Sequence, residues 1–222
     1  MRRIKAFIFD MDGTLVDNMR FHNQAWLTVL AEAGVSIEAD HLYASTAGLQ
    51  NAEILRHFLG DHLSGEAIAA YARRKEELYR AAYRPHVKAI PGAIAFLTAT
   101  RRMEVPAALA TSAGIENIDF ILSTLKIKDI FKAVVSGENL ANGKPDPGIF
   151  LEAARSLAID PDRCLVFEDS PLGLEAAHRA GMPAVLVATA RPVVDLKDHW
   201  DIRAVIRDYV GLDPAELIDR GH

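Results

Sequence analysis

The chain contains a single cysteine, Cys164, among its 222 residues. One cysteine excludes a disulfide bond within the chain, which fits a reducing compartment, and we therefore expect a cytoplasmic protein. Cys164 begins the apolar run 164–167, so we expect it to be buried as a small apolar side chain.

Long apolar segments and an excess of basic charge are also missing. No stretch approaches the ~18 consecutive apolar residues of a membrane span. The 25 lysines and arginines are outnumbered by 30 aspartates and glutamates, which leaves a net charge of −5. Binding to a phosphate backbone requires a basic surface. We therefore expect neither a membrane nor a nucleic acid as a partner.

The chain does contain enough apolar material for a sizeable core, because 50% of its residues are hydrophobic and 25% are charged. At roughly 150 residues per domain, its length corresponds to about 1.5 domains. This fraction suits a core of ordinary size that carries an insertion.

Short apolar runs alternate with segments of helical periodicity. The predicted strands cover 4–9, 105–110, 164–167 and 184–187, with weaker candidates at 134–135 and 204–206. The predicted helices between them cover 92–102, 114–125, 147–157 and 171–180. Runs that are apolar throughout are typical of strands buried on both faces. The alternation predicts an α/β fold with a doubly wound, Rossmann-like parallel sheet.

The segment 18–85 interrupts this alternation, because it contains helical periodicity and no strand-like run. One helix is expected to begin at Asp17 or Asn18, and a long charged helix is expected around 67–83. We therefore predict a catalytic core formed by residues 1–17 and 86–222, and an inserted all-helical cap domain formed by residues 18–85.

In open parallel sheets, ligands bind at the carboxyl ends of the strands. Four carboxylates and two hydroxyl side chains follow the predicted strands, and one lysine lies in the loop 143–147. These residues are Asp10, Asp12, Glu168, Asp169, Thr111, Ser112 and Lys144. We expect them to converge on one crevice.

Carboxylates that lie close together repel one another unless a cation neutralises them. Mg²⁺ binds one or two carboxylates together with a phosphate and waters, so this donor set suggests Mg²⁺ as cofactor. A lysine and small hydroxyls beside the metal suit a phosphoryl group. One carboxylate can then be the nucleophile, and another can protonate the leaving oxygen and later deprotonate water.

Four segments resemble the motifs of the haloacid dehalogenase-like hydrolase superfamily. They are residues 10–17 (DMDGTLVD), the strand that ends in Thr111-Ser112, residues 143–145 (GKP), and residues 166–173 (VFEDSPLG). The resemblance covers the whole chain, because the helical insertion lies where that superfamily has its helical cap.

The resemblance implies a role for each motif residue. Asp10 would be the nucleophile and a Mg²⁺ ligand, and Asp12 would be the general acid/base and a ligand through its carbonyl. Thr111, or alternatively Ser112, would hold the transferring phosphoryl group, and Lys144 would neutralise the nucleophile and the phosphoryl group. Asp169 would bind the metal, with Glu168 acting directly or through water.

Within the superfamily, the chain resembles the helical-cap subfamily of β-phosphoglucomutase and related sugar-phosphate phosphatases. His22 matches a histidine that helps to gate the acid/base of the mutase, Trp26 matches a tryptophan that lines its cap interface, and Lys75 matches a substrate-contacting cap lysine, so we expect all three at the substrate. The alternatives are an interdomain histidine, ordinary packing and a solvated face, respectively. After Gly48-Leu49, the mutase has an arginine that binds the second phosphate of its substrate, whereas this chain has Asn51. Loss of that bidentate phosphate contact weakens the case for mutase activity. Arg56, one turn later, is a possible substitute.

We therefore expect a Mg²⁺-dependent phosphohydrolase that cleaves small phosphate monoesters, with sugar phosphates favoured, through an aspartyl-phosphate on Asp10. A phosphomutase of the β-phosphoglucomutase type is the alternative, and a non-catalytic phosphosugar-binding protein is a minor one. The expected partner is a small phosphorylated metabolite, and the expected assembly is a monomer.

Overall fold

The computed structural model describes residues 3–46, 49–189 and 195–219. In these ranges a parallel sheet has the strand order β3-β2-β1-β4-β5-β6. Its strands are β1 (Ala6–Phe9), β2 (Ala107–Thr111), β3 (Ala133–Ser136), β4 (Cys164–Glu168), β5 (Ala184–Val187) and β6 (Ile202–Ile206). Each strand coincides with one of the apolar runs, so the predicted Rossmann-like fold is confirmed.

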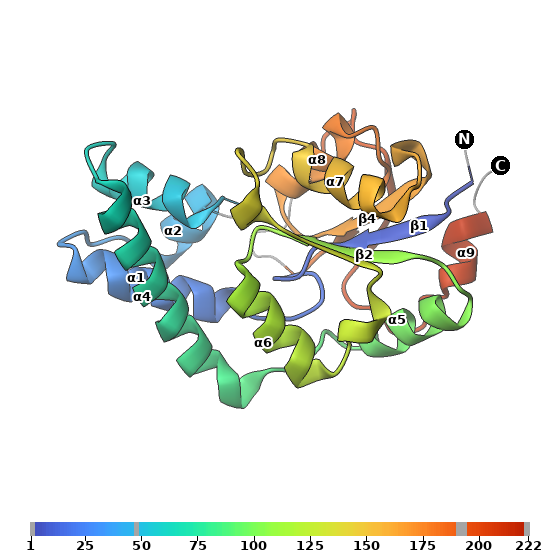
Figure 1. The fold of residues 1–222 in the computed structure, drawn as a ribbon, viewed down its shortest axis with the longest axis horizontal. Helices are drawn as coiled ribbons and strands as arrows, with labels where there is room; N and C mark the ends of the chain where they lie inside the picture. The colour runs from blue at the N-terminus through green and yellow to red at the C-terminus, as the bar shows by residue number, and fades with distance from the viewer. Residues whose placement is uncertain (1–2, 47–48, 190–194, 220–222) are drawn as a thin grey trace.

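Helices cover both faces of the sheet, because the side chains of each strand alternate between two apolar layers. In β1, Phe7 and Phe9 pack on one face, while Ala6 and Ile8 pack on the other. The first layer receives α5 (Ala93–Arg102) and α6 (Ile115–Leu125), and the second receives α7 (Gly148–Leu157) and α8 (Pro171–Arg179) (Figure 1). The short helix α9 (Pro214–Asp219) completes the first layer through Leu217.

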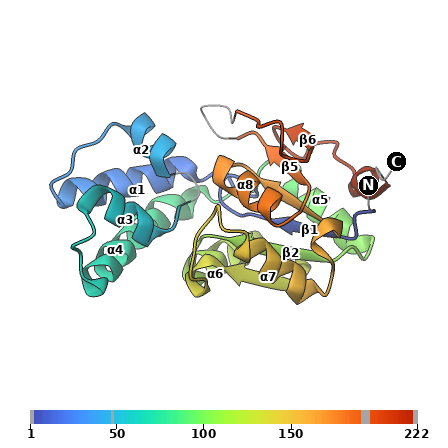
Figure 2. The same cartoon turned by 90° about the horizontal axis from the view of Figure 1, so that it is seen from above.

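In the described part of the segment between β1 and α5 there are four α-helices, which we call the cap helices. They are α1 (Met19–Glu32), α2 (Ala39–Thr46), α3 (Asn51–Leu59) and α4 (Gly65–Tyr83), followed by the short helix η1 (Arg84–His86). They enclose a separate apolar cluster that includes Trp26, Leu30, Leu42 and Leu55. Figure 2 shows them as a group beside the sheet, far from the chain ends. The exact division at residues 17/18 and 85/86 stays a prediction.

Three short helical turns complete the description: η2 (Lys128–Ile130), η3 (Gly137–Asn139) and η4 (Pro161–Arg163). None of the helices in the described ranges has the length and apolar character needed to cross a membrane. Cys164 is fully buried at the start of β4, as expected.

The topology places a crevice at the carboxyl end of β1. After β1, the chain continues to β2 and β3 on one side of that strand and then to β4, β5 and β6 on the other. Side chains that follow β1, β2 and β4 therefore meet at one edge, which is where ligands bind in open α/β sheets. The cap helices adjoin this edge (Figure 2).

Candidate active site

The turn after β1 positions Asp10 and Asp12. The amide nitrogens of Leu15 and Gly13 donate to the carbonyls of Met11 and Val16 at 2.8 Å each, which folds the chain sharply. Gly13 has φ +80°, and a Cβ there would lie 2.0 Å from Oδ2 of Asp169. Only glycine suits this turn, both because φ is positive and because Asp169 occupies the space.

Lys144 is the buried cation at the core end of the site, with a relative exposure of 3%. Its Nζ donates to Oδ1 of Asp10 at 2.8 Å and also contacts Oε1 of Glu168. Burial alone would lower the pKa of Lys144, but the two carboxylates outweigh burial and raise it. Lys144 therefore remains charged and links the end of β1 to the end of β4.

Glu168 and Asp169 are neighbours with different surroundings. Oε2 of Glu168 accepts hydrogen bonds from the amides of Asp169 and Ser170 at 2.8 Å each, and from Oγ of Ser170 at 3.0 Å. Within the described residues, no side-chain or backbone donor reaches the carboxylate of Asp169, although this residue is only 4% exposed. Glu168 thus has three hydrogen-bond donors and a contact with Lys144, whereas Asp169 lies against the turn after β1, where its Oδ2 would be 2.0 Å from a Cβ at Gly13.

The carboxylates at the core end of the pocket have too little positive charge around them. Burial, together with Glu168 and Asp12, raises the pKa of Asp10 to about 7 despite the contact with Lys144. Burial and the charges of Glu168 and Asp10 also raise the pKa of Asp169 well above its usual value. Such crowding of oxygen donors suits a divalent cation.

A ready-made group of three or more metal-ligating His, Cys, Asp or Glu side chains is not found among the described residues. The expected ligand set of Asp10, Asp12, Glu168 and Asp169 therefore stays a prediction. What supports a cation is the burial and crowding of the carboxylates of Asp10 and Asp169, which raise the pKa of both.

Asp12 faces the cap helices. Its Oδ1 accepts a hydrogen bond of 2.6 Å from Nδ2 of Asn18, and its Oδ2 lies 3.4 Å from Nε2 of His22. Asn18 also donates to the hydroxyl of Tyr79 at 2.6 Å. Burial would raise the pKa of Asp12, but His22 and Asn18 outweigh burial and lower it.

The contacts of His22 define which ring nitrogen carries the proton. Nζ of Lys75 lies 2.8 Å from Nδ1 of His22. Because a lysine ammonium can only donate, Nδ1 must be the acceptor. In a neutral ring this contact places the proton on Nε2, which lies 3.4 Å from Oδ2 of Asp12 and 3.4 Å from Nδ2 of Asn18. The ring is held in place by Tyr79, which stacks on it at a centroid distance of 3.7 Å.

Glu76 is a functional candidate that the sequence reasoning missed. Its Oε1 accepts from Nδ2 of Asn51 at 2.7 Å and from Nζ of Lys75 at 2.9 Å, while its Oε2 accepts from Nδ2 of Asn117 at 2.7 Å. Burial would raise the pKa of Glu76, but Lys75, His22 and the hydrogen bond from Asn51 lower it to about 2. The only signal in the sequence was its position next to Lys75.

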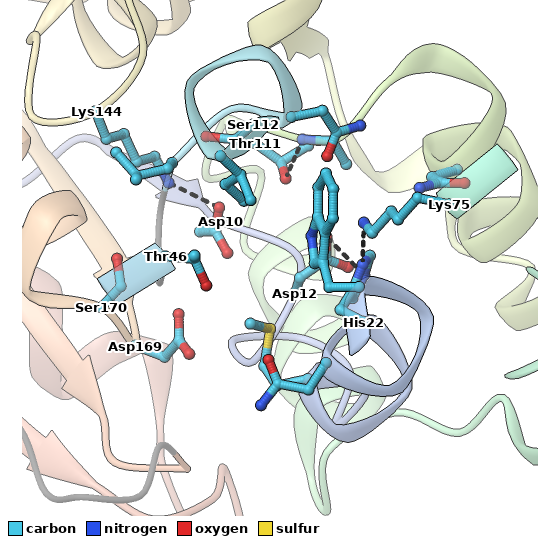
Figure 3. Close-up of a pocket in the computed structure, with 18 of the residues that line it drawn as sticks. Asp10, Asp12, His22, Thr46, Lys75, Thr111, Ser112, Lys144, Asp169 and Ser170 are labelled. Atoms are coloured by element: carbon cyan, nitrogen blue, oxygen red, sulfur yellow. Dashed lines mark hydrogen bonds and ion pairs between the residues drawn. The ribbon is translucent and has the colours of Figure 1, made fainter. Parts of the chain in front are cut away.

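One cavity of about 100 Å³ brings all the predicted site residues together. In Figure 3, Asp10, Lys144 and Asp169 lie on one side of it, and Asp12, His22 and Lys75 lie on the other. The predicted residues that line it are Asp10, Asp12, His22, Trp26, Asn51, Lys75, Thr111, Ser112, Lys144, Glu168 and Asp169. The lining residues that were not predicted include Thr46, Glu76, Asn117 and Ser170.

Two predicted residues, Trp26 and Thr111, are almost fully buried and also make contacts within the fold. Trp26 is 3% exposed and belongs to the apolar cluster of the cap helices, with Nζ of Lys75 at 5.3 Å from its ring centroid. Thr111 is 1% exposed, and its Oγ1 accepts a hydrogen bond of 3.2 Å from the amide of Ala113. Arg56 is exposed and does not line the cavity, and Gly48 lies outside the described residues.

The fold and the site define a hydrolase with a Rossmann-like core and carboxylates at the end of its first strand. Residues 4–181 match the haloacid dehalogenase-like hydrolase family. The chain belongs to this family, as the motifs indicated.

Curated relatives carry related names. The chain is 31% identical over 187 residues to hexitol phosphatase A of Escherichia coli, covering 83% of each chain. It is 32% identical over 201 residues to β-phosphoglucomutase of Bacillus subtilis, covering 86% of each. It is 30% identical over 190 residues to the 5-amino-6-(5-phospho-D-ribitylamino)uracil phosphatase of Arabidopsis thaliana, covering 85% of this chain. The match spans only 51% of that relative.

A solved structure of β-phosphoglucomutase from Clostridium difficile superposes with a TM-score of 0.84 and 25% identity. The superposition covers 96% of this chain and 95% of the other. Together with the phosphatase relatives, family membership makes the chain an enzyme of the phosphoric monoester hydrolase class.

Proposed function

We propose that the protein is a Mg²⁺-dependent phosphohydrolase that cleaves small phosphate monoesters, with sugar phosphates favoured, through an aspartyl-phosphate on Asp10. One observation carries the proposal: Asp10 is paired with buried Lys144 at the end of β1, while Asp12, two residues later, faces the cap helices. A nucleophile and an acid/base are thereby held on opposite sides of one small cavity (Figure 3).

The first step is transfer of the phosphoryl group to the enzyme. Lys144 contacts Oδ1 of Asp10, so we assign Oδ2 as the nucleophilic atom. Oδ2 attacks phosphorus while the bond from phosphorus to the ester oxygen breaks. Asp12, a carboxylate in this structure, must first take up a proton, which it then gives to that oxygen as the alcohol leaves. Lys144 and the hydroxyl of Thr111 stabilise the charge on the phosphoryl oxygens.

The second step returns the enzyme to its starting state. Asp12, now a carboxylate, takes a proton from a water molecule as that water attacks phosphorus. The bond between phosphorus and Asp10 breaks, and inorganic phosphate leaves. The hydrogen bonds from Asn18 and His22 hold Asp12 toward the cap helices, the side on which the leaving alcohol and the water must lie.

Mg²⁺ fits the donors that this chain provides. Asp10, the backbone carbonyl of Asp12 and Asp169 would hold it, because the carboxylates of Asp10 and Asp169 are buried, and because burial and the nearby charge of Asp10 both raise the pKa of Asp169. Glu168 is engaged with Lys144 and Ser170, which favours an indirect role for it. When bound, the ion supplies positive charge that neutralises the nucleophile and the phosphoryl oxygens.

Phosphomutase activity is the second candidate, because β-phosphoglucomutase relatives match most of the chain. A mutase must bind a bisphosphate intermediate in either orientation. Asn51 stands where the mutase has its phosphate-binding arginine, and no arginine is found among the described residues that line the cavity. The site therefore favours hydrolysis. The presence of Asp10, Asp12 and Lys144 also disfavours a non-catalytic binding protein.

The test is to incubate the pure protein and Mg²⁺ with a panel of phosphorylated metabolites and to measure free phosphate. We expect phosphate release from one or more sugar phosphates, loss of that activity with a chelator, and recovery when Mg²⁺ is restored. Mg²⁺ should also raise the melting temperature, because it binds only the folded state. Conversion of β-glucose 1-phosphate to glucose 6-phosphate without phosphate release would establish the mutase instead.

A further inference from the structure

A second cavity of about 440 Å³ adjoins the catalytic one between the cap helices and the core. Asn51, Glu76, Ser112 and Asn117 line both cavities. The inner cavity, at about 100 Å³, lies below the usual size of ligand pockets, roughly 300 Å³ or more. A substrate with its phosphate at Asp10 must therefore present its other end to this shared wall.

The wall is held together by the carboxylate of Glu76. Asn51 from α3 and Asn117 from α6 both donate to it at 2.7 Å, so Glu76 joins two cap helices to the core. The Nδ2 groups of both asparagines are directed at Glu76, and Oδ1 of Asn117 accepts from Arg80 at 2.9 Å. Toward a substrate, the wall therefore offers the carboxylate of Glu76, beside the remaining N–H groups of the two asparagines.

The charge at the wall is unsuited to a second phosphate. Phosphate oxygens are acceptors and carry negative charge, and they would face the Glu76 carboxylate. Lys75 is already bound to His22 and to Glu76. In the outer cavity, the arginines Arg73 and Arg80 are outnumbered by Glu76, Glu116 and Glu138, and Arg80 is paired with Glu116 at 2.8 Å.

A hydroxyl group is the better occupant. A carboxylate has about four acceptor positions, and Glu76 uses three of them for Asn51, Lys75 and Asn117. One position remains for a donor from the substrate. A half-buried carboxylate at this wall discriminates between substrates, because an unsuitable substrate opposes its charge.

We propose that Glu76 is a specificity-determining residue that selects monophosphate esters of neutral, hydroxyl-rich alcohols and rejects esters that carry a second phosphate. This inference rests on the proposed phosphohydrolase activity. Glu76 acts on the part of the substrate away from the reacting phosphorus, so its effect falls on the KM of the bisphosphate more than on kcat.

The experiment compares matched pairs of substrates, such as glucose 6-phosphate with glucose 1,6-bisphosphate and fructose 1-phosphate with fructose 1,6-bisphosphate. We expect kcat/KM of the monophosphate to exceed that of its bisphosphate by about 30-fold, because like charges are brought together at a partly desolvated wall. In Glu76→Gln this ratio should fall by about tenfold.

Glu77→Gln is the matched control, because it removes the same charge from the next position of α4, where the side chain is exposed and lines neither cavity. This control should keep the wild-type ratio. If Glu76→Gln does not fold, Asn51→Arg carries the test, because a guanidinium beside Glu76 should also lower the ratio.

The outcomes separate the two proposals. Turnover of monophosphates with an unchanged ratio in Glu76→Gln and Asn51→Arg would overturn the role of Glu76 alone. Equal kcat/KM values of the wild-type enzyme for a monophosphate and its bisphosphate would also overturn the role of Glu76. Absence of turnover for every monophosphate would overturn the phosphohydrolase proposal and this inference with it.

Discussion

The two halves of the pocket differ in how their charges are balanced. On the core side, Asp10, Glu168 and Asp169 share the single cation Lys144, and the pKa values of Asp10 and Asp169 are raised. On the cap side, Lys75 balances Glu76, and the pKa of Glu76 is lowered to about 2. The core half is short of positive charge, whereas Glu76 in the cap half is held by three protein donors.

The difference indicates a division of labour. A half that lacks positive charge is suited to receive a cation and to hold a phosphoryl group while bonds change. A half whose carboxylates are held by their own protein donors is suited to recognise the uncharged part of a substrate. Changes in the core half should therefore act mainly on kcat, and changes in the cap half mainly on KM and on stability.

The largest expected effect comes from Asp10→Asn in the core half. An amide cannot form the phosphoenzyme, so turnover should fall by about 10⁴-fold or more. The fold should persist, because asparagine has nearly the same shape and removes one of the crowded carboxylates. Phosphate release and thermal unfolding measure the two effects. Asp61→Asn, in the exposed turn after α3, serves as control. Substantial residual turnover in Asp10→Asn would refute the covalent mechanism.

Asp12→Ala tests the residue that lies between the two halves. Loss of the acid should lower kcat by about 10³-fold for a sugar phosphate, whose alkoxide leaves poorly. The loss should be much smaller for p-nitrophenyl phosphate, whose leaving group needs little protonation. Steady-state kinetics with both substrates provide the measurement. Equal losses on the two esters would argue against Asp12 as the acid.

The two halves were also unequally predictable from the sequence. Asp10, Thr111, Glu168 and Asp169 follow buried strands, and parallel strands bring their carboxyl ends to one edge whatever their distance along the chain. Their convergence could therefore be predicted from short apolar runs and from the residues that come next. The fold was predictable for the same reason, since every strand and the helices α5 to α8 lie close to their expected ranges.

The cap half depends on how helices pack, which periodicity does not specify. A helical pattern predicts which residues share a face but not which residues of another helix they meet. Asn18 contacts Tyr79, 61 positions later, and Glu76 contacts Asn117 of the core, 41 positions later. Glu76 was missed for this reason. The short helices α2, α3 and α9 were not delimited either, because eight, nine and six residues carry little periodic signal.

The smallest expected effect concerns stability and the cap half alone. Glu76 has a folded-state pKa of about 2, against an ordinary value of 4.5. A depressed pKa stabilises the folded protein above the unfolded-state pKa, and this contribution is lost as the pH falls toward 2. The full contribution corresponds to about 3 kcal/mol. Glu76→Gln lacks this pH-dependent contribution.

Urea unfolding of the wild type and of Glu76→Gln at pH 6 and pH 3 would measure the effect. The stability difference between the two proteins should shrink by about 2 kcal/mol from pH 6 to pH 3. At pH 3, Glu76 is protonated in the unfolded chain but still ionised in the folded protein, and this protonation stabilises the unfolded wild type. Glu77→Gln, measured in parallel, corrects for pH effects of removing any glutamate from α4. A difference that does not change with pH would mean that Lys75, Asn51 and Asn117 do not hold Glu76 as a carboxylate. The contrast between a cap half with a stabilised carboxylate and a core half with destabilised carboxylates would then fail.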